Sequence, residues 1–115
     1  MTSGIRTIVI PVKDLEAAKA LYGTLLGTEP YVDQPYYVGF RPDGAPEVGL
    51  DPNGHAQGLT GPVTFWHVPD ITAALAALVA AGAEEQQPVK DVGAGTLTAT
   101  VRDSDGNVTG LYQAP

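Results

Sequence analysis

An internal repeat constrains the fold of this chain more than any other feature. Residues 12–18 (VKDLEAA) return as residues 68–74 (VPDITAA), and each copy continues through an apolar helical pattern to a glycine, Gly27 or Gly82. A second, shorter repeat follows: residues 48–50 (VGL) return as residues 109–111 (TGL). Repeats are typical of a supersecondary unit that cannot cover its own apolar face and therefore packs against a second copy of itself. The sequence therefore predicts two similar modules.

Each module is predicted to contain one strand, one helix and three further strands. In both modules an aspartate, Asp14 or Asp70, can accept hydrogen bonds from the first free amides of the helix, and the following glycine can end it. Alternation and turn residues predict the strands, which are residues 5–12, 31–33, 36–41 and 47–51 in the first module and 63–68, 84–89, 96–102 and 107–113 in the second. The expected buried stripes are Leu15, Ala18, Tyr22, Leu25 and Leu26 in the first helix and Ile71, Ala74, Leu75, Leu78 and Val79 in the second. The fold class is therefore α+β, with module one at 1–51, a Gly- and Pro-rich linker at 52–61 and module two at 62–115.

Composition excludes several kinds of site and partner. The 115-residue chain has no cysteine, so disulfides, thiolate zinc sites and cysteine nucleophiles are excluded. Thirteen acidic residues against six basic ones give a net charge of −7, which repels nucleic acid and anionic membranes. No apolar stretch is long enough to cross a bilayer. We expect a cytoplasmic protein that binds neither nucleic acid nor membrane.

The duplicated βαβββ unit resembles the vicinal oxygen chelate superfamily, which includes glyoxalase I, the bleomycin resistance proteins and the extradiol dioxygenases. The segments that carry the resemblance are residues 12–15 (VKDL), 65–71 (FWHVPDI) and 105–111 (DGNVTGL). The resemblance implies that the modules form a curved mixed sheet around a cleft, with the helices on the outer faces. It also implies a homodimer, which would cover open sheet edges.

In the metal-dependent members of that superfamily, four cleft-facing positions hold a divalent ion. Counting back from the helix-capping aspartates places two of these positions at Thr7 and Val63. The second, shorter repeat places the other two at Gly49 and Gly110. These residue types cannot hold a catalytic cation, so we expect no metal and no cofactor, and metal-dependent catalysis is disfavoured. A different metal site from His55, His67, Glu47 and Asp51 is the weaker alternative.

Without metal ligands, the resemblance implies a hollow that binds a small molecule. The two glycines are expected to leave open volume, and strand alternation predicts a partly aromatic lining of the kind that ligand pockets use. The candidate ligand-binding residues are Thr7, Val9, Tyr36, Phe40, Gly49, Val63, Phe65, His67, Gly110 and Tyr112, with Tyr37 and Arg41 as the alternative to Tyr36 and Phe40. Trp66 has the opposite parity to Phe65 and is expected to pack under the second helix.

Three functions follow from these residues. The first is metal-free binding or sequestration of an apolar or aromatic small molecule, as the metal-free bleomycin resistance proteins do. The second is an enzyme of the same superfamily. It would use His67 as acid or base, with Tyr112 or an arginine polarising the substrate, or it would use a non-standard metal site. The third is a module that binds a partner protein through its exposed edges while its cleft is filled by its own side chains.

Overall fold

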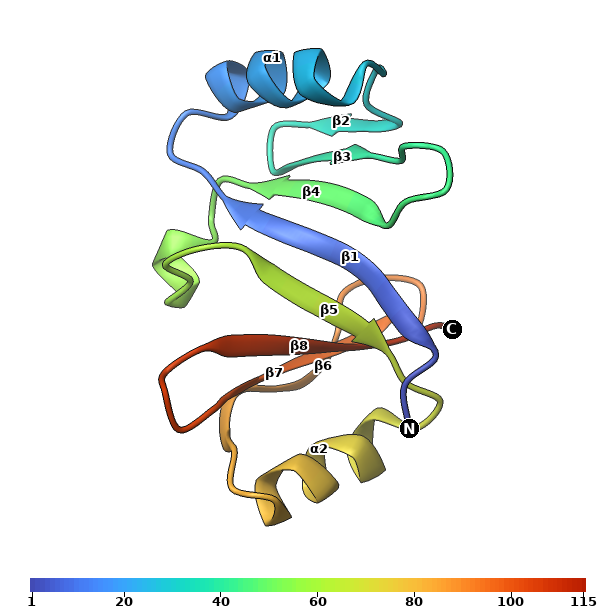
Figure 1. Cartoon of the computed structure of the whole chain (residues 1–115), viewed down its shortest axis with the longest axis vertical. Helices are drawn as coiled ribbons and strands as arrows, with labels where there is room; N and C mark the ends of the chain where they lie inside the picture. Colours follow the sequence, from blue (N-terminus) through green and yellow to red (C-terminus); the bar gives the residue numbers. More distant parts are fainter. The chain divides into compact units, whose positions relative to one another are not determined.

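A computed structural model describes all 115 residues, which divide into two compact units. The first unit comprises Thr7–Val63, and the second comprises Met1–Arg6 together with Thr64–Pro115. The α+β class and the duplicated βαβββ order are confirmed (Figure 1). No helix of the chain has the length and apolar character needed to cross a bilayer.

The first unit carries one helix on one face of a mixed sheet. Its elements are β1 (Gly4–Pro11, from Thr7 onward), α1 (Leu15–Leu26), β2 (Val32–Gln34), β3 (Tyr37–Phe40) and β4 (Glu47–Asp51). The strand order is β2-β3-β4-β1, with antiparallel pairs except for the parallel pair of β1 and β4. The apolar core lies between α1 and the sheet, where Val38, Phe40 and Leu50 are fully buried.

The second unit repeats this plan. Its elements are β5 (Val63–His67, from Thr64 onward), α2 (Ile71–Ala80), β6 (Glu84–Asp91), β7 (Leu97–Arg102) and β8 (Val108–Gln113), in the strand order β5-β8-β7-β6. The pair β5 and β8 is parallel, and the other pairs are antiparallel. A core of Ile71, Ala74, Val101, Leu111 and their neighbours lies between α2 and the sheet.

Both helices begin where the repeated aspartates predict. Asp14 accepts a hydrogen bond from the amide of Ala17 at 3.0 Å, and Asp70 accepts one from Ala73 at 3.1 Å. Gly27 ends α1 in the left-handed conformation, with φ of 67°, which glycine adopts without steric cost. The repeat therefore encodes the helix starts through local hydrogen bonding.

Each helical stripe is narrower than predicted. Leu25 is 72% exposed and Val79 is 47% exposed, so the assignment of these two residues to the buried stripes is wrong. The other eight residues of the two stripes lie within or against the cores. Trp66 pairs in register with buried Leu111, on the α2 side of the sheet, and remains partly exposed.

The segment predicted to be a linker has structure of its own within the first unit. It contains a 3-10 turn, η1 (His55–Gln57), and Leu59 is buried. Gly54 packs against Pro11 so closely that a Cβ there would lie 2.6 Å from the proline Cβ. His55 lies at the surface, in line with its expected place in a loop.

Candidate functional site

The face of the first unit that α1 does not cover is polar and aromatic. Alternation along the strands places Val38, Phe40, Val48 and Leu50 toward α1. The residues between them therefore point to the opposite face, which we call the helix-free face. This face carries Tyr37, Gly39 and Arg41 from β3 and its end, Glu47 and Gly49 from β4, and Thr7 and Val9 from β1.

The ring of Tyr37 covers Gly49. A Cβ built on Gly49 would lie 1.9 Å from the Tyr37 hydroxyl oxygen and 2.5 Å from its Cζ, so no larger residue fits while the ring stays in place. Gly39, the cross-strand partner of Gly49, is flanked by two rings, since its Cβ would lie 3.2 Å from both Tyr31 and Tyr37. The prediction of open volume at Gly49 is therefore wrong: aromatic rings fill that space.

The two tyrosines converge on one buried carboxylate. Glu47 is only 7% exposed and accepts hydrogen bonds from the hydroxyls of Tyr31 and Tyr37, the latter at 2.6 Å. A carboxylate bonded in this way is a strong acceptor, and removing a donor would leave a costly buried charge. Glu47 thereby fixes both rings over the glycines.

Arg41 completes this cluster. One of its terminal nitrogens lies 3.8 Å from Glu47 Oε1, and its guanidinium carbon lies 4.1 Å from the centre of the Tyr31 ring. Guanidinium groups stack on aromatic faces in this way. The helix-free face thus offers an aromatic surface with an exposed cation, and the buried carboxylate of Glu47 holds both in place.

The predicted pair Tyr36 and Phe40 does not line this face. Phe40 alternates with Val38 and is fully buried under α1, and Tyr36 precedes β3 and is 64% exposed. The alternative pair, Tyr37 and Arg41, occupies the helix-free face instead. The choice depended on where β3 begins, because a shift of one residue exchanges the two faces of a strand.

In the second unit the ring of Phe65 covers Gly110 in the same manner. The two residues are register partners on β5 and β8, and a Cβ built on Gly110 would lie 2.4 Å from the ring. The prediction of open volume is wrong here as well. Gly49 and Gly110, which occupy equivalent positions in the repeat, are therefore each covered by an aromatic ring from a neighbouring strand.

His67 and Tyr112 lie beside Phe65 and Gly110 on the face of the second unit's sheet that α2 does not cover, which is the helix-free face of that unit. Their rings meet edge to face, with centroids 5.2 Å apart and an interplanar angle of 89°. The guanidinium carbon of Arg6 lies 5.1 Å from the centre of the Tyr112 ring. The backbone oxygen of His67 accepts hydrogen bonds from Thr2 Oγ1 at 2.7 Å and from the Ser3 amide at 3.2 Å, which holds the end of β5 in place.

The four family positions do not fit a divalent metal. Thr7 and Val63 are buried and contribute at most one neutral hydroxyl, and Gly49 and Gly110 contribute no side chain and are covered by rings. Carboxylates and imidazoles are the ligands that such ions require. The chain contains no group of three or more His, Cys, Asp or Glu side chains that could hold a metal ion. The alternative set with His55 and Asp51 is therefore not assembled either.

Sequence reasoning did not identify Tyr31 as part of a site, and it considered Glu47 only as a metal ligand. The available signal was alternation: Glu47 stands two residues before Gly49 and so shares its face. Tyr31 lies just outside β2, where alternation gives no guidance. Its position depends on the hydrogen bond from its amide to the Gly39 carbonyl at 2.9 Å.

A family model described as the Glyoxalase/Bleomycin resistance protein/Dioxygenase superfamily matches residues 4–111. No curated protein matches the chain. Among solved structures, a superfamily member from Vibrio splendidus 12B01 is 20% identical with a TM-score of 0.72, covering 96% of this chain and 99% of that one. Methylmalonyl-CoA epimerase from Mycobacterium tuberculosis is 17% identical with a TM-score of 0.69, covering 99% and 90%. The Mn(II)-bound glyoxalase from Novosphingobium aromaticivorans is 23% identical with a TM-score of 0.71, covering 97% of this chain and 39% of that one.

Proposed function

Because the chain belongs to the glyoxalase/bleomycin resistance protein/dioxygenase superfamily, we propose that it binds an apolar or aromatic small molecule without a divalent metal. The ligand lies against the helix-free faces of the sheets. One observation carries this proposal: at Gly49 and Gly110, two of the positions that hold the ion in metal-dependent members, aromatic rings stand in place of oxygen donors.

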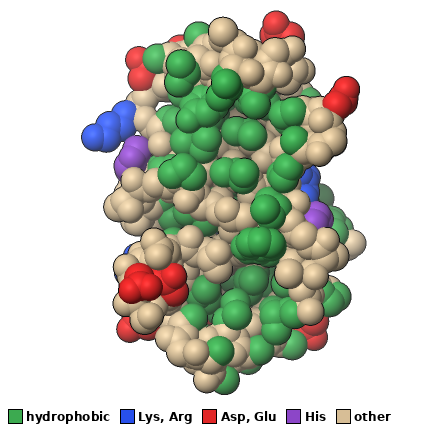
Figure 2. Space-filling model, in the orientation of Figure 1, with side chains coloured by type: hydrophobic (Ala, Val, Ile, Leu, Met, Phe, Trp, Pro, Cys, Tyr) green, Lys and Arg blue, Asp and Glu red, His purple; other side chains and the backbone are tan.

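The chemistry around the rings suits a planar ligand. Aromatic side chains stack on flat molecules, and a few fixed polar groups orient them. Beside Tyr37, the exposed guanidinium of Arg41 supplies a donor, while buried Glu47 holds the rings in place. Beside Phe65, His67 and Tyr112 can supply both a donor and an acceptor. On the side of the molecule that Figure 2 shows, apolar side chains gather over α1 and over β2, β3 and β4.

Titration with indole and 2-naphthol, followed by amide chemical shifts in NMR spectra, tests this proposal. We expect saturable shifts at Tyr37 and Gly49 or at Phe65 and Gly110, unchanged by EDTA or by added Mn²⁺. Tyr37→Ala or Phe65→Ala should weaken binding at the corresponding face by about tenfold or more, in the range of one aromatic contact. The matched control is Tyr36→Ala, which removes an exposed tyrosine one residue from Tyr37. Binding that appears only with a divalent ion would contradict the proposal.

A second candidate function is acid–base catalysis by His67. The observation that favours it is the contact of His67 with Tyr112, which in turn lies under Arg6. If the chain is such an enzyme, His67→Ala should lower turnover by roughly 10² to 10⁴. If it is a binder, the same change should leave ligand affinity within a small factor.

A further inference from the structure

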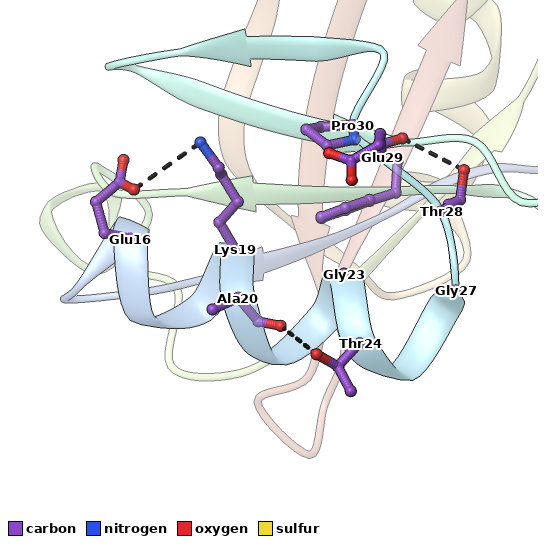
Figure 3. Close-up of a pocket in the computed structure, with 10 residues that line it drawn as sticks. Glu16, Lys19, Ala20, Gly23, Thr24, Gly27, Thr28, Glu29 and Pro30 are labelled. Carbon is purple, nitrogen blue, oxygen red and sulfur yellow. Dashed lines mark hydrogen bonds and ion pairs between the residues drawn. The ribbon is translucent and has the colours of Figure 1, made fainter.

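A separate cavity lies on the α1 side of the first unit, away from the helix-free face. Its volume is about 530 Å³, and it opens between the C-terminal half of α1 and the turn at residues 27–30. The buried ring of Phe40 and the backbone of Gly23 line it, together with Glu16, Lys19, Glu29 and Pro30 (Figure 3). A cavity of this size is within the range of small-molecule sites.

The charge around this cavity is negative. Lys19 donates a hydrogen bond to Asp33 at 2.8 Å and lies 3.9 Å from Glu16, so two carboxylates already hold its ammonium. The hydrogen bond to Asp33 raises the pKa of Lys19, and the charges of Asp33, Glu16 and Glu29 add to this effect. Glu16 and Glu29 line the cavity with one ammonium, which Asp33 already holds, so the charge at the cavity is negative.

The end of α1 adds to this negative potential. The last carbonyls of a helix carry partial negative charge, which basic side chains in the last turn commonly balance. The last turn of α1 contains no basic residue. A cation placed in the cavity would lie beside this helix end.

Gly23 leaves room in the wall of this cavity. A glycine inside a helix costs stability relative to alanine. A Cβ at Gly23 would find ordinary contacts, 3.7 Å to the Phe40 ring and 3.8 Å to the Thr28 carbonyl oxygen. Packing therefore does not require glycine here, and the missing methyl group leaves space in the cavity above Phe40.

We propose that this cavity binds a small organic cation, namely a protonated amine that carries a short apolar or aromatic group. The ammonium lies beside Glu29 and the end of α1, and the apolar group lies over Gly23 and against Pro30. The net charge of −7 favours the approach of such a cation from solution.

NMR titration with benzylammonium tests the site, with benzoate and benzyl alcohol as the anionic and neutral probes of the same shape. We expect benzylammonium to shift the amides of Gly23, Thr24, Gly27 and Glu29, and its affinity to fall as salt increases. Benzoate should leave these amides unchanged. Shifts confined to Phe65, Gly110, Tyr37 or Gly49 would instead report the face assigned under the proposed function, so the two proposals can fail independently.

Two variants complete the test. Glu29→Gln should weaken benzylammonium about tenfold, the loss expected for a charge-assisted contact. Its control is Glu85→Gln, which removes an exposed carboxylate on β6 and should change the affinity less than twofold. Gly23→Ala should raise the melting temperature and weaken benzylammonium by at least about fivefold, because its methyl group occupies the cavity. Equal shifts with benzoate, equal affinities for the two glutamine variants, or unchanged affinity for Gly23→Ala would each overturn the proposal.

Discussion

Gly49→Ala would place a methyl carbon where the Tyr37 ring now lies. The new Cβ would be 1.9 Å from the phenol oxygen and 2.7 Å from Cε1, so the ring must rotate away. Its hydroxyl would then lose Glu47, which it now contacts at 2.6 Å. Overpacking costs about 1 to 3 kcal/mol, and a hydrogen bond to a charged group contributes about 1.5 to 3 kcal/mol. Because one ring movement causes both losses, we expect the free energy of unfolding to fall by about 2 to 4 kcal/mol.

Equilibrium denaturation in urea measures this change, and Gly61→Ala is the matched control. Gly61 has no atom within 4 Å of a Cβ built on it, so alanine there should be neutral or slightly stabilising. In a Tyr37→Ala background the cost of Gly49→Ala should drop by more than about 1 kcal/mol, since the clashing ring is gone. Equal stabilities for Gly49→Ala and Gly61→Ala would refute the placement of Tyr37 over Gly49.

Three further predictions concern stability. Glu47→Gln keeps the shape of the side chain but removes the charge that two phenols contact, so the free energy of unfolding in urea should fall by about 1 to 3 kcal/mol, while Glu85→Gln should change it little. Asp14→Ala and Asp70→Ala each remove a helix cap and should each cost about 1 kcal/mol in the same assay, and a loss from only one of them would show that the repeated caps are not equivalent. The hydrogen bond from the backbone amide of Asn107 lowers the pKa of Asp103 below its usual value. This carboxylate therefore stabilises the fold at pH values above its unfolded-state pKa, and the stabilisation is lost as the pH falls through its folded-state pKa. The melting temperatures of the wild type and of Asp103→Asn should therefore differ at neutral pH and converge in acid.

Local chemistry made the secondary structure predictable from the sequence. The caps at Asp14 and Asp70 and the turn at residues 103–106 depend on hydrogen bonds between residues close in the chain. Such signals can be read without knowledge of the tertiary fold. The repeat then gave the number of modules, since each copy carries the same signals.

The candidate site was less predictable, because it depends on contacts between strands. Alternation alone left Tyr36 and Tyr37 equivalent until the start of β3 was known. A glycine in a strand indicates either empty space or a close neighbour, and only the register of Phe65 with Gly110 shows that a ring occupies the position. Likewise, Leu25 and Leu26 both fit a helical stripe, and the sheet beneath α1 decides that only Leu26 is covered.

Native mass spectrometry of gently purified protein tests the central claim most directly. The instrument reports organic ligand and metal content from one sample, and the same sample can be exposed to Mn²⁺ or Zn²⁺ before measurement. We expect chains that take up no stoichiometric divalent ion and that bind 2-naphthol equally with and without a chelator. A tightly held ion, one per chain, that must be present for 2-naphthol to bind would contradict the replacement of metal ligands by aromatic rings.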